Sequence, residues 1–257
     1  MEIRFQFLDF VKVFATSILI YAGFTVLFVL LKINGGDEYG AALRIEDFPP
    51  LVAFLIQYLI QFVILFFPLW VFVVNKYGTT LKDFGFHKIA WGKGLKAVLL
   101  AYATYMVISA VILALIASLN LKIPGYEAQE SYLPLFGTAP LEIIGGFFFI
   151  VIVAPFLEEL LFRGFIYRLF TKIWPLWVAS LFAALLFALA HVQLQSFFPL
   201  LLLGLILNWT CRKTGSVWTA VAFHSLNNAV AFSVDIYFTL HPAALEQITA
   251  FIYTMRI

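Results

Sequence analysis

The sequence predicts an all-α fold: a polytopic transmembrane helical bundle of about seven membrane helices, with six to eight as the range. Hydrophobic residues make up 63% of the 257 residues and charged residues only 12%. The mean hydropathy is +1.00, which is far above that of an ordinary soluble domain. The apolar residues also gather in runs long enough to cross a bilayer. We therefore expect a single integral membrane domain over residues 1–257.

The apolar runs place the individual helices. A hydrocarbon layer of ~30 Å takes roughly 20 apolar residues in a helix. Runs near this length are bounded by charges, glycine and proline. The fifth and sixth runs are short, so we expect tilted helices or helices sheltered by their neighbours. The predicted helices cover residues 11–31, 51–74, 97–118, 141–164, 176–191, 197–211 and 217–240.

Loop charges predict the orientation. The first apolar run is longer than a signal-peptide core and lacks a clear cleavage site, so we interpret it as a retained first helix. The positive-inside rule then makes the lysine-rich segment 75–96 cytoplasmic and the acidic first loop external. This topology puts the N-terminus in the cytoplasm and leaves residues 241–257 as a candidate interfacial segment. The charges that set it are Lys76, Lys82, Lys88, Lys93 and Lys96 against Asp37, Glu38, Glu46 and Asp47.

Charge balance and cysteine content exclude several classes of function. The net charge is +2, from 16 basic and 14 acidic residues, which gives no reason to expect a nucleic-acid partner. Cys211 is the single cysteine, so an internal disulfide and any multi-cysteine metal site are excluded. Chemistry must therefore come from carboxylates, histidines and amides.

Two glutamates and an arginine interrupt the fourth apolar run, in the stretch APFLEELLFRGF. An ionisable side chain at membrane depth costs roughly 2.5–3.5 kcal/mol on insertion scales, so each needs a reason to be there. Glu159 and Arg163 are spaced i, i+4 and can form a structural ion pair on one helix face. Glu158 points about 100° away from Glu159 and has no obvious partner on its own helix.

Further polar residues lie on the fifth and seventh helices. FALAH places Phe187 and His191 one turn apart, and HSLNN places His224 and Asn228 at i, i+4. Taken singly, such residues are more often packing or helix contacts. At 1.5 Å per residue, however, they reach overlapping depths of roughly 10–22 Å together with Glu158. Their convergence predicts one shared polar site that admits water.

This set of side chains fits hydrolysis by an activated water. Glu158 can act as general base while His191 holds the same water. His224 and Asn228 can donate to the oxyanion that develops on a peptide carbonyl. We expect no required cofactor. The residues leave one alternative open, in which Glu158, His191 and His224 bind zinc, although the HExxH spacing is absent.

The ordered motifs EExxxR, FxxxH and HxxxN, across residues 139–235, resemble the CAAX prenyl endopeptidase type 2 family, also called the CAAX protease and bacteriocin-processing (Abi) family. LKDFGF at 81–86 is similar to a short element found in many members. The resemblance implies an intramembrane endopeptidase in which Glu158 and His191 activate water and His224 and Asn228 stabilise the oxyanion. Glu159, Arg163 and Phe187 are the supporting motif positions. The resemblance leaves both a glutamate-dependent and a metalloendopeptidase mechanism open.

We therefore expect a membrane-embedded protease that cuts membrane-anchored or lipidated substrates, with prenylated CAAX proteins as one class. Its partners would be the substrate and the lipid bilayer. The compact length and short loops favour a prokaryotic plasma membrane. A second interpretation is a membrane scaffold or bacteriocin self-immunity protein without chemistry. A coupled transporter is less favoured, because the sequence shows no internal repeat.

Overall fold

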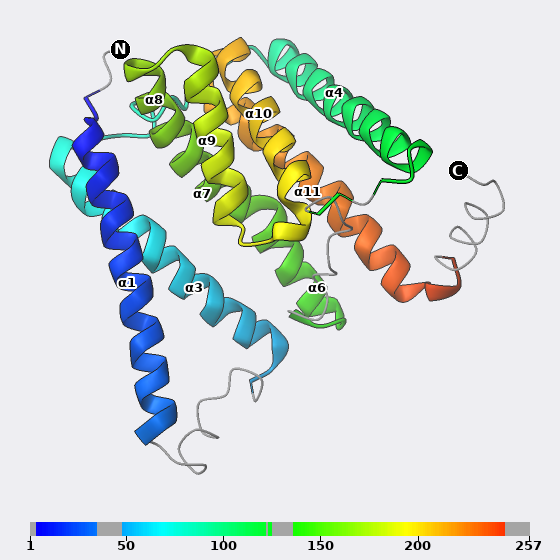
Figure 1. The fold of residues 1–257 in the computed structure, drawn as a ribbon, viewed down its shortest axis with the longest axis horizontal. Helices are drawn as coiled ribbons and strands as arrows, with labels where there is room; N and C mark the ends of the chain where they lie inside the picture. Colours follow the sequence, from blue (N-terminus) through cyan, green and yellow to red (C-terminus); the bar gives the residue numbers. More distant parts are fainter. Residues whose placement is uncertain (1–3, 35–47, 122, 125–135, 245–257) are drawn as a thin grey trace. The chain divides into compact units, whose positions relative to one another are not determined.

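The protein is helical throughout the part of the chain that its computed structural model describes, residues 4–34, 48–121, 123–124 and 136–244. These ranges contain no strand (Figure 1), which confirms the all-α prediction. The acidic residues of the first loop and the segment 245–257 lie outside the described residues. The helices are α1 (Phe7–Asn34), α3 (Pro50–Leu69), η2 (Trp70–Asn75), α4 (Trp91–Ser118), α6 (Pro140–Phe147), η3 (Phe148–Val153), α7 (Ala154–Glu159), η4 (Leu160–Tyr167), α8 (Arg168–Ile173), α9 (Leu176–Ala190), η5 (Leu194–Ser196), α10 (Phe197–Thr214) and α11 (Val217–Leu240).

Each of the seven predicted apolar runs corresponds to a helix. Four stretches are long and apolar enough to cross a membrane, namely Phe7–Leu27, Pro50–Asn75, Trp91–Ser118 and Pro140–Ile173. The apolar α9 is shorter, with 15 residues. The helices α10 and α11 have 18 and 24 residues but carry more polar side chains. The chain is therefore a polytopic integral membrane protein.

The two largest differences from the predicted bounds are extensions of helices. The third predicted helix begins at Trp91 instead of residue 97, and the fourth continues to Ile173 instead of ending near 164. In both cases the prediction stopped at basic residues, Lys93 and Lys96 in one helix and Arg168 in the other. Basic side chains end an apolar run without ending a helix, because a long helix can continue beyond the hydrocarbon layer.

The stretch Pro140–Ile173 contains two π segments, η3 and η4. Pro155 follows η3 closely and lacks the N–H that an α-helical register needs, so the backbone hydrogen-bond pattern must change near it. The second π segment begins immediately after Glu159 and contains Arg163. Single π turns inside α-helices occur often at functional sites.

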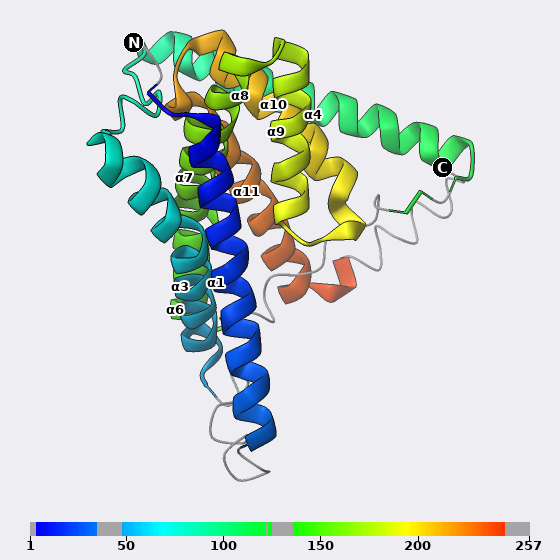
Figure 2. The ribbon, with the colours of Figure 1, turned by 60° about the vertical axis from the view of Figure 1, so that its left-hand side comes forward.

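Contacts divide the chain into two compact units. The first comprises residues 1–83 and 134–146, and the second comprises residues 84–133 and 147–257. Within the first unit, α1 and α3 lie side by side (Figure 2). The single membrane domain expected from the sequence stays a prediction.

A buried carboxylate joins α1 to the segment that follows η2. Asp9 is fully buried and accepts hydrogen bonds from Lys76 Nζ at 2.6 Å and the Tyr77 hydroxyl at 2.7 Å. The backbone N–H of Gln6 donates to the same carboxylate at 2.8 Å. The hydrogen bond to Asp9 raises the pKa of Lys76 above its ordinary value, so this lysine keeps its charge. The start of α1 is thereby tied to the segment that follows η2.

Close helix packing organises the second unit. The helix α10 lies beside α9, α4 and α11, and the segments η3, α7 and η4 pack against α11. A Cβ at Gly204 would lie 3.0 Å from Ala184 Cβ and 3.1 Å from Ala184 Cα, so the glycine allows α9 and α10 to approach closely. The core contains the fully buried side chains of Phe165, Ile166, Phe170, Phe187, Leu207 and Phe223.

The LKDFGF element contributes to this core at its second half. Phe84 and Phe86 are buried, and Gly85 adopts a φ of +86°, a conformation that favours glycine. The carbonyl of Gly85 accepts a hydrogen bond from the N–H of Val217 at 3.0 Å. The hydroxyl of Ser216 donates to the carbonyl of His87 at 2.6 Å. The loop therefore holds the first turn of α11, the helix that carries His224.

We expect Asp9→Asn to destabilise the protein. The substitution removes the charge that three donors share inside the first unit, and hydrogen bonds to charged groups contribute about 1.5–3 kcal/mol each. Thermal unfolding of the detergent-purified protein measures the loss. Asp83→Asn is the matched control, because Asp83 accepts from the Thr80 N–H and hydroxyl and an amide oxygen can replace that acceptor. Equal losses of stability for the two variants would contradict a stabilising role of the buried hydrogen bonds to Asp9.

Candidate active site

The ion pair predicted between Glu159 and Arg163 is present at the centre of the second unit. Arg163 Nη1 donates to Glu159 Oε1 at 2.9 Å, and both side chains are buried. Burying two charges costs several kcal/mol per ion, which the pair recovers only when the remaining donors and acceptors also find partners. The surroundings of Arg163 supply such partners.

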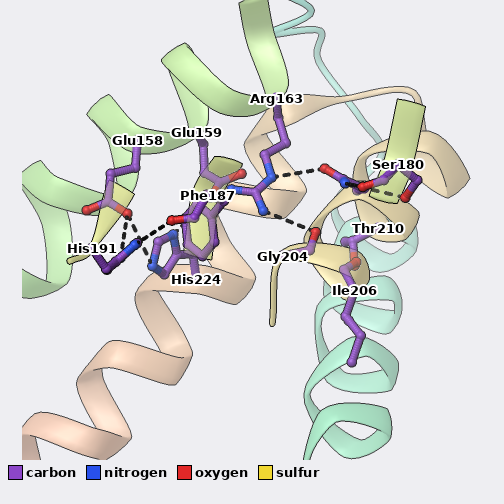
Figure 3. A network of polar contacts seen from close by, with 11 residues as sticks. Glu158, Glu159, Arg163, Ser180, Phe187, His191, Gly204, Ile206, Thr210 and His224 are labelled. Atoms are coloured by element: carbon purple, nitrogen blue, oxygen red, sulfur yellow. Dashed lines mark hydrogen bonds and ion pairs between the residues drawn. The ribbon is translucent and has the colours of Figure 1, made fainter. Parts of the chain in front are cut away.

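The guanidinium of Arg163 has further contacts beyond Glu159. Nη2 donates to the carbonyl of Gly204 at 3.1 Å, and Nε donates to Asn208 Oδ1 at 3.2 Å. The Phe187 ring lies 4.3 Å from the guanidinium carbon, which is a cation–π distance. Figure 3 shows Arg163 between Glu159, Phe187 and Gly204. Phe187, a supporting motif position, thus makes a cation–π contact with the Arg163 guanidinium.

His224 is oriented by the same carboxylate. Its Nδ1 lies 2.9 Å from Glu159 Oε1, which also accepts from Arg163. A carboxylate paired with arginine is an acceptor, so His224 Nδ1 carries the hydrogen and donates it. The opposite ring nitrogen, Nε2, lies 3.9 Å from Glu158 Oε2. Glu159 therefore fixes which edge of the imidazole faces Glu158.

His191 reaches the same point from α9. It is the residue directly after the last helical residue, Ala190, and its Nδ1 lies 2.7 Å from the carbonyl of Phe187. A carbonyl only accepts, so Nδ1 carries the hydrogen and the neutral ring presents a lone pair at Nε2. That Nε2 lies 3.6 Å from Glu158 Oε2. Figure 3 shows Glu158, His191 and His224 directed toward one another.

Glu158 differs from Glu159 in its surroundings. Its Oε2 is buried and has no hydrogen-bond partner among the described residues. The separations of 3.6 and 3.9 Å to the two imidazoles exceed a direct hydrogen bond. The side chains of Glu158 and His191 are 27% and 24% exposed, whereas His224 is 3% exposed and Glu159 is fully buried. The Glu158 and His191 side of the cluster is therefore the accessible side.

Asn228 contacts the helical stretch that carries Glu158, but at an earlier residue. Its Nδ2 donates to the carbonyl of Ile150 at 3.0 Å. Ile150 lies in η3, where π pairing would direct its carbonyl to the N–H of residue 155. Pro155 has no N–H, so the amide of Asn228 supplies the missing donor. The i, i+4 pair His224 and Asn228 thus shares one face of α11, and the second hydrogen on Nδ2 is not used by this contact.

Several residues of the network were not predicted. Asn208 and Gly204 of α10 contact Arg163, and Asn208 Nδ2 donates to the carbonyl of Ser180 on α9 at 2.9 Å. A signal for Asn208 was available, since it is the one strongly polar residue within the apolar run LLLLGLILNW. No pattern identifies the backbone carbonyl of Gly204, because carbonyls carry no sequence signature.

Metal binding by Glu158, His191 and His224 stays a prediction. In the part of the chain that the structure describes, no group of three or more His, Cys, Asp or Glu side chains is arranged to hold a metal ion. His224 Nδ1 and His191 Nδ1 are both engaged with protein oxygens, so only the Nε2 atoms are available as ligands.

Residues 140–230 match the model of a protein family described as Rce1-like, type II CAAX prenyl endopeptidase Rce1-like. The matched segment runs from α6 to α11 and contains the three motifs. The resemblance predicted from these motifs is therefore confirmed for this segment. At the level of the family, it indicates a membrane protease of the CAAX type.

Two curated proteins are similar to parts of the chain. An uncharacterized 24.3 kDa protein of Escherichia coli is 36% identical over 80 residues, which cover 29% of this chain and 37% of that protein. The UPF0177 protein YbdI of Lactococcus lactis subsp. lactis (strain IL1403) is 33% identical over 87 residues, 34% of this chain and 46% of that protein. The chain thus spans less than half of each relative. No solved structure matches it.

We expect Arg163→Met to destabilise the protein by about 3–5 kcal/mol, because it leaves Glu159 as an unpaired buried charge. Adding Glu159→Gln to the same chain should recover part of this loss. Unfolding of the single and double variants in detergent measures both effects, with the exposed Arg212→Met as the control for losing a cation on a neighbouring helix. Losses that simply add would show that the two charges do not act as a pair.

Proposed function

Since residues 140–230 match a type II CAAX prenyl endopeptidase family, we propose that this protein is an intramembrane endopeptidase. It hydrolyses peptide bonds of membrane-anchored or lipidated substrates with a water activated by Glu158 and His191. The observation that carries the proposal is the approach of Glu158 Oε2 to two imidazole Nε2 atoms, at 3.6 and 3.9 Å. No serine or cysteine is needed as a nucleophile.

Water activation follows from the acceptors that face the accessible side. A water between Glu158 Oε2 and His191 Nε2 can donate one hydrogen to each, which directs its oxygen lone pair toward a substrate carbonyl. Glu158 accepts the proton as the carbon–oxygen bond forms, and the same carboxyl group then gives that proton to the leaving amine nitrogen as the carbon–nitrogen bond breaks. General acid–base catalysis of this kind contributes about 10²–10⁴-fold.

The oxyanion would be stabilised by His224 and Asn228. When His224 is protonated, its Nε2–H points to the region beside Glu158, while Nδ1–H stays bound to Glu159. The carboxylate of Glu159 compensates the charge of that imidazolium. Asn228 has one amide hydrogen that its contact with Ile150 does not use. Donors fixed before the reaction stabilise an oxyanion without having to reorganise.

Substrate access sets the class of substrate. Glu158 and His191 are partly exposed; Glu158 lies on the stretch Pro140–Ile173, which is long and apolar enough to cross a membrane, and His191 follows the shorter apolar α9. A substrate held in or at the bilayer reaches this side without leaving the membrane. A lipid anchor on the peptide, prenyl groups included, would keep the scissile bond close to the site. The lysine-rich segment 75–96 favours approach from the cytoplasmic side.

We expect Glu158→Gln to lower kcat for a cleavable peptide by about 10²-fold or more, because a neutral amide cannot accept the proton of water. The assay uses quenched fluorescent peptides, farnesylated and unmodified, with detergent-purified protein. Glu142→Gln is the matched control: it makes the same change on the same long helix, where the glutamate caps the N–H of Ala139.

Two results would overturn the proposal. In one, the Glu158→Gln protein cuts as fast as wild type. In the other, wild type leaves the whole peptide panel intact under conditions in which an active family member cuts it. The second result, combined with a normal cellular phenotype of Glu158→Gln, would favour a scaffold or self-immunity role.

A chelator separates the water mechanism from the zinc alternative. If Glu158 and His191 activate water without a metal, incubation with a zinc chelator should leave kcat unchanged, and added zinc should not raise it. Loss of activity on chelation with recovery on zinc addition would instead assign Glu158, His191 and His224 as metal ligands. Metal analysis of the purified protein checks the same point without an activity assay.

A further inference from the structure

Asn208 is a buried amide on α10 whose two ends are both engaged. Its Oδ1 accepts from Arg163 Nε at 3.2 Å, and its Nδ2 donates to the carbonyl of Ser180 at 2.9 Å. The Ser180 carbonyl can only accept, so the amide nitrogen must face it and the amide oxygen must face Arg163. The orientation of Asn208 is thus fixed by α9 on one side and by the guanidinium on the other.

The helix α10 holds Arg163 through two atoms. The carbonyl of Gly204 and the side chain of Asn208 lie at i, i+4 on one helix face, and they accept from Nη2 and Nε respectively. Two acceptors on different nitrogens define the plane of the guanidinium, which one acceptor cannot do. The remaining nitrogen, Nη1, is then directed at Glu159 Oε1.

We propose that Asn208 is a positioning residue of the active site, a role that rests on the proposed function. It acts through Arg163 and Glu159 on His224. The chain of contacts runs from Ser180 through Asn208, Arg163 and Glu159 to His224 Nδ1, with donor–acceptor distances between 2.9 and 3.2 Å. By fixing Glu159, this chain keeps His224 Nε2 directed toward Glu158 and the reacting carbonyl. In this role Asn208 acts on the reaction only through Arg163.

A positioning role predicts a specific kinetic defect. Asn208→Leu has a similar size but offers Arg163 no oxygen. We expect kcat to fall about tenfold or more, in the range that loss of an orienting partner costs at other sites. KM should stay within about twofold, because interactions made only in the transition state are lost. Asn208→Ser, whose shorter side chain does not reach Arg163, should show the same kcat defect and guards against a folding failure of the leucine variant.

The control is Thr210, two residues further along the same helix. It is also buried, but its hydroxyl donates to the carbonyl of Ile206 within α10 at 2.8 Å. Figure 3 shows Thr210 and Ile206 together, away from Glu158. Thr210→Val should therefore keep kcat and KM of wild type. A kcat loss in Thr210→Val as large as that in Asn208→Leu would overturn the proposal.

A double-mutant cycle tests whether Asn208 acts through Arg163. Arg163→Lys keeps the charge but loses the planar set of donors that Asn208 orients. If Asn208 works through this guanidinium, adding Asn208→Leu to Arg163→Lys should lower kcat by less than a further twofold. Independent losses that multiply in the double variant would contradict the proposed route.

An NMR measurement decides the positioning role without turnover. Protein labelled with ¹⁵N-histidine, with the His224 signals assigned from a His224→Gln variant, should show Nδ1 protonated in wild type. Asn208→Leu should shift the His224 ring signals, whereas Thr210→Val should not. Unchanged His224 signals in a folded Asn208→Leu protein would overturn the proposal. A wild type that cuts no peptide would count against the proposed function alone, since the His224 signals still test this contact chain.

Discussion

The burial of the Arg163 guanidinium is the constraint on which the second unit depends. A guanidinium has five N–H donors and cannot lose its charge in a protein, so its place among apolar helices requires several acceptors at once. Glu159, Gly204 and Asn208 provide them, and Phe187 covers the charge with its ring. These partners come from α7, α9 and α10. Glu159 also binds His224, and this contact connects α11 to the same network. One buried charge thus fixes the relative placement of the helices that carry the proposed catalytic groups.

The proline in the central helix has a related consequence. Pro155 removes one N–H next to η3, and the carbonyl of Ile150 is satisfied by Asn228 instead. A backbone irregularity at membrane depth is tolerated only where a side chain or a cavity supplies the missing hydrogen bond. The same contact aligns α11 with the central helix one turn from His224. The local break in helix geometry and the alignment of the proposed oxyanion donors therefore have one physical origin.

The helices and the polar cluster could be predicted from the sequence because both follow from the free-energy cost of leaving polar groups without partners in the bilayer. Apolar runs must be helical in a bilayer, and ionisable residues at membrane depth must meet, which brought Glu158, His191 and His224 together. The sequence did not predict the shared role of Glu159, whose spacing to Arg163 explained it as a local pair, because its second bond to His224 depends on tertiary packing. The Gly204 carbonyl and the π segments were also missed, since backbone acceptors and register changes leave no residue pattern. The continuation of the fourth helix to Ile173 was missed because basic residues resembled a helix end.

In the proposed mechanism, Glu158, His191 and His224 face one point where a water is activated. An experimental structure of the detergent-solubilised protein, with anomalous scattering measured at the zinc edge, tests it most directly. We expect Glu158 Oε2 to lie near both Nε2 atoms, with a water oxygen about 2.7–3.2 Å from Glu158 and His191. A metal ion about 2.0–2.1 Å from the two Nε2 atoms, or a Glu158 side chain turned away from both imidazoles, would contradict it.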